Sequence, residues 1–439
     1  MTRTHVPDLT APRAPKRLRS AEAVLDNGLR VVAVRKPGVP VVEIRLRVPF
    51  LSAKPAHPAR AALLAETVAA GAGDLDRIGI AAAVQALGGE LSVGVDADRL
   101  IMSGNVLATN LAALLGIVAT IVTDPAYDRG EVATERARLV EKLTIARARP
   151  GVVASEALGH RMWGAHPYAV DLPTPDAVGA VTPAQLKTLH RAQVRPDGAV
   201  LILVGELPPA RMLENARRAF EPWTGAPVSS RVPALPAAPA GPLLVVDRPG
   251  SVQTSIRSGA PALPRSDPGY PALQLANLIF GGYFSSRWTE NIREDKGYTY
   301  GPHSRIDHHV LGSVLNLDVE VATEVTAPAL LETWYELGRI ASLPVGAAEV
   351  ESVRQYAIGT LALSTATQAG LASTLAGLAA FDLGLDWIAG HPARLLATSV
   401  EQVSAAAARF FAPSAFTSVA VGDANLIAGP LSALGAVER

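Results

Sequence analysis

The two halves of this 439-residue chain repeat the same residues at a steady offset, and this repeat limits the possible folds more than any other feature. Near the start of each half, matching residues lie about 212 positions apart. They are Val34, Pro37, Gly38, Ile44, Arg45 and Pro49, which recur as Val246, Pro249, Gly250, Ile256, Arg257 and Pro261. Near the end of each half, Gln185, Pro196 and Gly205 recur about 217 positions later as Gln402, Pro413 and Gly422. The repeat predicts two copies of one module rather than a single domain.

A segment rich in proline and alanine, residues 223–242, lies close to the middle of the chain. Prolines stiffen a connection, so we interpret this segment as a linker that holds two modules apart. The predicted domains are therefore residues 20–222 and residues 243–439. A chain of this length is long enough for two domains.

The order of strand and helix patterns predicts an α+β fold for each module. Residues 24–34 are typical of two strands joined by a tight turn at Asn27 and Gly28. Helical patterns follow at 58–70 and 76–87, strands within 90–106, and further helices at 107–122, 128–149 and 152–162. This order is too irregular for βαβ units and favours a mainly antiparallel sheet covered by helices. Two such modules on a stiff linker predict a clam-like shape with a ligand cavity between them.

The composition excludes several classes of function. Forty basic residues balance forty acidic ones, so the net charge favours neither a nucleic acid nor an anionic membrane as a partner. The chain has no cysteine, which excludes disulfides, thiol nucleophiles and cysteine metal sites. Residues 1–19 lack the apolar core of a secretory signal, and the apolar helix expected around 371–381 is too short to cross a bilayer. We therefore expect a cytoplasmic protein.

Residues 284–301 combine a helix, a glycine stop and polar side chains suited to binding a carbonyl. Phe284, Trp288 and Ile292 share one helical face, with Ser285 or Ser286 as the expected N-cap. Gly297 is expected to end the helix, and Tyr298 to Tyr300 to begin a strand. Together, the guanidinium of Arg293 and a tyrosine hydroxyl can hold a peptide carbonyl or an oxyanion. The alternative is a surface arginine and a half-buried tyrosine on an ordinary turn.

An ordered set of motifs resembles the M16 (pitrilysin/insulinase-like) metallopeptidases. The set comprises residues 26–32 (DNGLRVV), a helix ending at Gly71-Ala72, residues 87–91 (LGGEL), residues 164–168 (GAHPY) and residues 284–301. It is most similar to the two-module M16B subfamily that includes the mitochondrial processing peptidase and its bacterial relatives. The resemblance runs from about residue 21 to the end, and it implies the internal repeat that the residues show independently.

Active members of that family bind zinc through His-x-x-Glu-His on a helix and a later glutamate. The corresponding positions here are Ala62, Leu63, Leu64, Ala65 and Glu66, and the later glutamate falls near Leu143 or Thr144. Neither histidine is present, and no histidine lies between His57 and His160. We therefore expect no metal in this chain. The other histidines, including His308 and His309, lack ligand spacing and are expected to be structural or solvated.

The resemblance implies that the chain keeps another part of the family's apparatus. In two-subunit members one chain supplies zinc and the other an arginine and a tyrosine, which correspond here to Arg293 and Tyr300. Gly281, Gly282 and Tyr283 stand where processing-peptidase α subunits have a longer glycine-rich loop that senses substrate. All five residues are candidate substrate-binding residues, and Arg293 and Tyr300 are candidate catalytic residues.

The sequence supports one main hypothesis and two alternatives. The chain is expected to be the zinc-less subunit of a heterodimeric M16B-type peptidase, inactive alone, whose zinc-bearing sister subunit completes the site. Its substrates would be unfolded peptides or a precursor's leader peptide, bound as an added strand. One alternative is a structural, non-proteolytic member of the superfamily, and another is a homodimer that captures peptides without cleaving them.

Overall fold

The computed structural model describes residues 18–226, 232–238 and 241–439. The predicted linker, 223–242, therefore lies partly outside the described residues. The strands are β1 (Arg19–Val24), β2 (Arg30–Arg35), β3 (Val41–Pro49), β4 (Gly71–Ala72), β5 (Leu75–Asp76), β6 (Glu90–Val95), β7 (Arg99–Leu107), β8 (Val200–Gly205), β9 (Leu243–Asp247), β10 (Gln253–Ala262), β11 (His303–His309), β12 (Gly312–Ala322), β13 (Thr417–Gly422) and β14 (Val437–Glu438).

The helices complete the chain order. They are α1 (His57–Thr67), α2 (Arg77–Ala86), α3 (Leu111–Thr123), α4 (Arg129–Arg147), α5 (Pro150–Trp163), α6 (Pro175–Gly179), α7 (Pro183–Gln193), α8 (Pro209–Phe220), α9 (Tyr270–Asn277), α10 (Arg287–Thr289), α11 (Thr326–Ser342), α12 (Ala347–Ser364), α13 (Gln368–Leu378), α14 (Leu385–Ala397), α15 (Val400–Phe410) and α16 (Ala424–Ser432).

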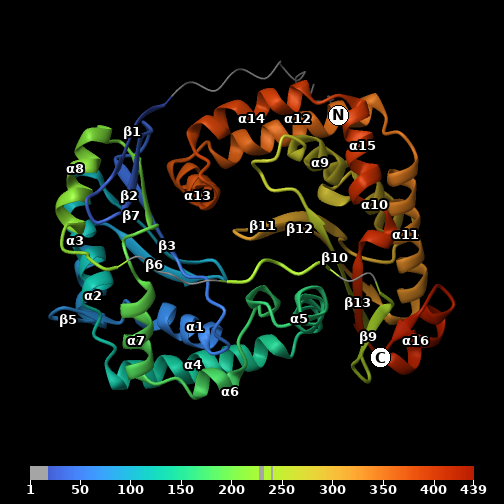
Figure 1. The fold of residues 1–439 in the computed structure, drawn as a ribbon, viewed down its shortest axis with the longest axis horizontal. Coiled ribbons are helices and arrows are strands. Elements are labelled where there is room, and N and C mark those ends of the chain that lie inside the picture. The colour runs from blue at the N-terminus through green and yellow to red at the C-terminus, as the bar shows by residue number, and fades with distance from the viewer. Residues whose placement is uncertain (1–17, 227–231, 239–240) are drawn as a thin grey trace, which may run out of the picture.

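Two six-stranded sheets, in which five strands follow the same order, form the centre of the protein; the sixth strands, β1 and β14, differ in chain position and direction. The first sheet runs β1-β2-β8-β3-β7-β6, and the second, counted from its end, runs β14-β9-β13-β10-β12-β11. The pairs β2·β8, β9·β13 and β9·β14 are parallel and the remaining pairs in both sheets are antiparallel. Helices cover these sheets, which confirms the predicted α+β fold class (Figure 1).

The strand register repeats with the offsets found in the sequence. Ile44 pairs with Leu203 in the first sheet, and Ile256 pairs with Ala420 in the second. Ile256 lies 212 positions after Ile44, and Ala420 lies 217 positions after Leu203. The sequence offsets therefore mark structurally equivalent backbone positions. The domain limits themselves, 20–222 and 243–439, stay predictions.

Each half of the chain covers the inner face of the other half's sheet with one helix. Leu371, Leu375 and neighbouring residues of α13 pack on Val34, Ile202 and other residues of the first sheet. Helix α5 does the same on the second sheet, with the apolar contacts Ala154, Leu158, Met162, Val314, Val419 and Val421. Figure 1 shows α13 beside the blue strands and α5 beside β13. This exchange fixes the two halves relative to each other.

Most local predictions are confirmed, but the region after Phe280 differs from its prediction. The hairpin at Asn27-Gly28 is present, with Gly28 at φ +90°. In residues 284–301, α10 continues as a π-helical segment, Glu290–Asp295, and Ser286 is the N-cap. Phe284 precedes α10, which begins at Arg287, and is 61% exposed while Trp288 and Ile292 are buried, so the prediction that the three share one helical face is wrong.

The strand predicted at Tyr298 to Tyr300 is also wrong, because β11 begins only at His303. Gly297, at φ +65°, turns the chain, and the Tyr298 N–H donates back to the carbonyl of Ile292 over 2.9 Å. The Thr299 hydroxyl then donates to the carbonyl of Glu320 over 2.6 Å. This hydrogen bonding holds Tyr298 to Tyr300 as an irregular segment rather than a strand.

No single helix within residues 18–226, 232–238 and 241–439 is long and apolar enough to cross a membrane. The segments Gln368–Phe381 and Leu385–Ala397 reach that length and composition only as a pair, which bends by 90°.

Candidate functional site

A cavity of about 1090 Å³ lies between the two halves. Among the described strands, β6 pairs only with β7 and β11 pairs only with β12, so each sheet has a free edge. Both edges face the cavity. Residues 93–95 of β6 and 305–309 of β11 line this cavity. The two edge strands are equivalent in the repeat. The cavity therefore offers two unpaired strand edges to which an extended peptide can add.

Helix α1 forms one wall of the cavity with the residues that stand at the positions of the M16 zinc motif. Ala62, Ala65 and Glu66 line the cavity, whereas Leu63 and Leu64 point into the core and are fully buried. The Glu66 carboxylate lies 3.5 Å from Lys142 Nζ of α4. Two methyl groups and an ion-paired carboxylate do not fit zinc, which needs imidazole, thiolate or several carboxylate ligands.

The position expected for the later glutamate also offers no ligand. Leu143 is buried and lines the cavity, and the Thr144 hydroxyl donates to the carbonyl of Val140 over 2.8 Å. Among the residues that the structure describes, no three His, Asp or Glu side chains gather as a metal site would require.

His57 begins α1 and lines the same wall. Its ring packs against Phe50 with the ring centroids 5.2 Å apart, and only 7% of the residue is exposed. Burial lowers the pKa of His57 to about 4. The imidazole is therefore neutral at pH 7 and serves the packing of this wall.

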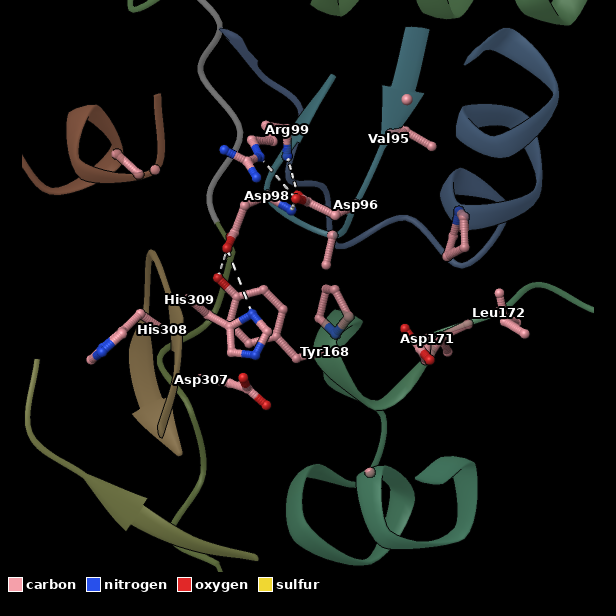
Figure 2. Close-up of a pocket in the computed structure, with 18 of the residues that line it drawn as sticks. Val95, Asp96, Asp98, Arg99, Tyr168, Asp171, Leu172, Asp307, His308 and His309 are labelled. Carbon is pink, nitrogen blue, oxygen red and sulfur yellow. Dashed lines mark hydrogen bonds and ion pairs between the residues drawn. The ribbon is translucent and has the colours of Figure 1, made fainter. Parts of the chain in front are cut away.

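Asp98 joins the two halves across the cavity, and we call its contacts the Asp98 latch. Asp98 lies between β6 and β7 and accepts hydrogen bonds from the Tyr168 hydroxyl and, over 3.1 Å, from the Val310 N–H. His309 Nδ1 lies 3.7 Å from the carboxylate. Figure 2 shows the side chains of Tyr168 and His309 converging on Asp98. The latch thus connects the first sheet's hairpin to the turn between β11 and β12.

The charge on Asp98 is stabilised where it lies. Burial alone would raise the pKa of Asp98, but the nearby His309 and hydrogen bonds from the Tyr168 hydroxyl and the Val310 N–H outweigh it and hold the pKa below its usual value. Burial and the bond to Asp98 raise the pKa of Tyr168, so its hydroxyl stays a donor. No motif in the sequence marked this cluster, because its members come from three distant segments.

The structure brings Arg293 and Tyr300 together, as a stacked pair outside the cavity. The Arg293 guanidinium lies 4.5 Å from the ring centroid of Phe284 and 5.2 Å from that of Tyr300. Its Nε lies 3.3 Å from Glu294, and Tyr300 is 90% exposed. Neither Arg293 nor Tyr300 lines the cavity. Their assignment as catalytic residues stays a prediction.

Gly281, Gly282 and Tyr283 close a helical segment rather than form a loop. Gly281 and Gly282 end a π-helical segment, Leu278–Gly282. A Cβ on Gly281 would come within 2.8 Å of the Trp288 ring, and the Tyr283 ring packs on Tyr356 at 5.1 Å. These contacts give the three residues a packing role, and their contact with substrate stays a prediction.

Parts of this chain are similar in sequence to one family model and to several bacterial proteins. Residues 180–356 match the family model described as "Peptidase M16 inactive domain". An uncharacterized zinc protease of Streptomyces coelicolor is 26% identical over 233 residues, which are 51% of this chain and 50% of that protein. One of Mycobacterium leprae is 26% identical over 52% of each chain, and one of Mycobacterium bovis is 25% identical over 70% of each. The chain thus spans about half the length of the first two relatives.

Solved structures share the fold. A peptidase M16 inactive domain from Pseudomonas fluorescens superposes with a TM-score of 0.85 at 22% identity, covering 92% of this chain and 98% of that one. A protease from Helicobacter pylori gives a TM-score of 0.83 at 17% identity, covering 92% and 99%. The protein is therefore similar to M16 inactive-domain proteins in fold, and its sequence relatives are named as zinc proteases.

Proposed function

We propose that this protein is the zinc-less, peptide-binding subunit of a heterodimeric M16B-type peptidase whose sister subunit carries zinc. The observation that carries the proposal is the cavity wall itself. Helix α1 places Ala62 and the ion-paired Glu66 where the motif's two histidines would stand and Ala65 where its glutamate would stand, yet the cavity keeps two free strand edges. The chain has lost the chemistry of the family's zinc site and kept a place to hold a substrate.

A peptide would bind as an added strand along β6 or β11. Six-residue β6 is long enough to hold roughly 20 Å of extended chain. Main-chain hydrogen bonds would supply most of the affinity, so sequence selectivity would be broad. The substrates would be unfolded peptides or leader peptides, because a folded domain does not fit a cavity of about 1090 Å³.

Arg293 and Tyr300 would act on a peptide held at the sister subunit's zinc. Arg293 would bind a substrate carbonyl, and Tyr300 would donate to that carbonyl or to the oxyanion of the tetrahedral intermediate. Their place outside this chain's cavity and the 90% exposure of Tyr300 leave them accessible to a second subunit. The zinc-bearing sister and the cytoplasmic location are parts of this proposal.

A second candidate is a protein that binds peptides without contributing to their cleavage. One contact favours it: Arg293 is stacked between two rings and lies 3.3 Å from Glu294, so its guanidinium is already engaged. The two candidates differ in whether Arg293 affects turnover.

A reconstitution assay separates them. A quenched, unstructured peptide is incubated with this chain, with a zinc-motif sister, and with an equimolar mixture, each with zinc. We expect activity only in the mixture, and Arg293→Ala to reduce turnover on the order of 10²–10³-fold. Tyr300→Phe should reduce it similarly, whereas the matched control Phe284→Leu keeps both donors and most of the activity. Full activity of the sister alone, unchanged by this chain, would leave the binding protein as the function.

A further inference from the structure

We propose that Arg265, held against Trp387, forms a subsite of the cavity that binds a carboxylate of the bound peptide. The proposal rests on the proposed function, because it concerns a peptide in the same cavity. It adds a preference for a carboxylate to a cavity whose strand edges would contact only the main chain of the peptide.

Arg265 differs from the other arginines that line the cavity. Arg99 is paired with Asp96 at 2.9 Å, and Arg257 and Arg305 are both paired with Asp318. Arg265 has no ion pair within the described part of the chain, although its side chain lines the cavity. A guanidinium carries five N–H donors, so this one has donors to offer to a ligand.

Arg47 is a second cavity-lining arginine that has no ion pair among the described residues, but its surroundings are different. It is only 5% exposed, and burial and the nearby Arg99 lower its pKa, while Asp98 and Asp96 oppose that change. Arg47 therefore lies in the field of two carboxylates. Because these carboxylates offset the charge of Arg47, Arg265 is the stronger candidate for binding an anion.

The guanidinium of Arg265 is positioned before any ligand binds. It lies 5.7 Å from the ring centroid of Trp387, and the Trp387 indole N–H donates to the carbonyl of Arg265 over 3.2 Å. Trp387 in turn stacks on His391 at 4.2 Å with an angle of 14° between the rings. A cation fixed on an aromatic ring loses little side-chain freedom on binding, which favours affinity.

The groups around Arg265 do not neutralise it. Burial lowers the pKa of the neighbouring His308 and His391 to about 3 in each case, and the charge of Arg265 adds to the effect at His308, as do the charges of Arg394 and then Arg265 at His391. Both imidazoles are therefore neutral at pH 7. His308 also lines the cavity, and its Nε2 is buried with no hydrogen-bond partner among the described residues. An anion entering the cavity here would meet the Arg265 guanidinium beside neutral rings, with Arg394 on the same Trp387 ring but outside the cavity lining.

The subsite lies next to the strand edge that a peptide would extend. His308 belongs to β11, whose free edge lines the cavity, and Arg265 lines the same cavity near that residue. A peptide bound along β11 would therefore place one of its side chains or its C-terminus near Arg265. The ligand is a carboxylate, which an aspartate or glutamate side chain or the peptide's C-terminus can supply.

Equilibrium binding of three labelled peptides to this chain alone tests the subsite. All three share one unstructured sequence: a neutral peptide with blocked ends, the same peptide with one glutamate, and the neutral peptide with a free C-terminus. We expect one carboxylate peptide to bind about tenfold more tightly than the neutral peptide. A preference for the glutamate peptide identifies a side-chain subsite, and a preference for the free C-terminus identifies an end-binding subsite.

Three substitutions make the assignment specific to Arg265. Arg265→Met should abolish the preference and leave the affinity for the neutral peptide unchanged. The matched control is Arg394→Met, which also removes a cation from Trp387, at 5.5 Å, but at a position that does not line the cavity. It should keep the preference. Arg265→Lys, which keeps the charge but not the fork of donors, should keep part of it, and thermal unfolding checks that each variant folds.

The outcomes separate this inference from the proposed function. If all three peptides bind equally to the wild type, or if the preference survives Arg265→Met, the subsite is wrong while peptide binding stands. If no peptide binds, the proposed function fails, and the subsite fails with it.

Discussion

At the scale of single residues, the sequence predicted which residues take the positions of the zinc motif but not the role of the histidine at the start of α1. The sequence shows only that His57 stands at the start of the helix, and its contact with Phe50 depends on a strand end seven residues earlier. The same holds for Asp98, Tyr168 and His309, which lie in unrelated patterns along the chain and meet only in the fold. A motif names residues in one segment, whereas these contacts depend on tertiary packing.

The first prediction concerns the pH dependence of stability through His57. Its pKa is about 4 in the folded protein and ordinarily 6.5, so between pH 6.5 and 4 the unfolded chain takes up a proton that the folded chain does not. Stability is thus lost as the pH falls through this window. His57→Gln should reduce that loss by about 1–3 kcal/mol. Urea unfolding at pH 7.5 and pH 4.5 measures it. The exposed His160, changed to Gln, should leave the loss unchanged.

The second prediction tests whether Gly281 packs or binds. A Cβ there would meet the Trp288 ring at 2.8 Å and Ser304 Cβ at 3.0 Å, so Gly281→Ala should destabilise the fold by about 1–3 kcal/mol. Peptide affinity of the folded variant should not change. Gly338, in α11, has nothing within 4 Å of the place that a methyl group would take, so Gly338→Ala should stabilise by roughly 0.5–1 kcal/mol. A loss of peptide affinity in Gly281→Ala without destabilisation would restore the substrate role.

At the scale of elements, the sequence patterns predicted the type and order of helices and strands better than they predicted which strands lie at the edge of a sheet. The strands and helices of the first half follow their periodicity because hydrophobic positions report burial directly. The segment from Tyr298 to Tyr300 has strand-forming residues, yet the hydrogen bond from Thr299 to Glu320 holds it outside the sheet. Likewise, the sequence pattern predicts strands within residues 90–106 but does not show that β6 lies at the edge of its sheet. Edge position is set by pairing between distant segments.

The third prediction follows from β6 and β11 as free edges. A peptide added to a strand uses main-chain N–H groups on only one of its two sides. N-methylation at alternate residues in one register should therefore weaken binding on the order of 10–100-fold, since two or three hydrogen bonds are lost. Methylation in the other register should have little effect and is the internal control. Equal weakening in both registers, measured by fluorescence anisotropy, would argue against an added strand.

At the scale of the whole molecule, the sequence predicted two similar halves with a cavity between them but not the helices that they exchange. The equal offsets in sequence and register show why the first inference was possible, because each module keeps its own pairing residues. Nothing in a repeated sequence says that α13 covers the first sheet and α5 the second. Two modules with similar sheets have the same local sequence pattern whether a helix covers the sheet of its own module or that of the other module. The exchange brings the two halves together around the cavity.

The fourth prediction is that the Asp98 latch keeps the cavity closed on this side. Its carboxylate binds Tyr168 of the first half and the Val310 N–H of the second, so Asp98→Asn should weaken the contact between the halves by about 1–3 kcal/mol. The pKa of Asp98 is lowered in the fold, so its stabilisation is present above about pH 4 and is lost as the pH falls through the folded pKa. Acidification should therefore mimic the substitution.

Hydrogen exchange at pH 7 measures this opening directly. The amides of Val310 and Leu311, which donate to Asp98 and to the Tyr168 hydroxyl, should exchange faster in Asp98→Asn, while amides in the core strand β8 should not change. Asp171→Asn, which alters an exposed carboxylate lining the same cavity, serves as the control. If β8 exchanges faster as well, Asp98 supports global stability rather than closure. If only the turn between β11 and β12 is released, the latch governs access to the strand edge at β11.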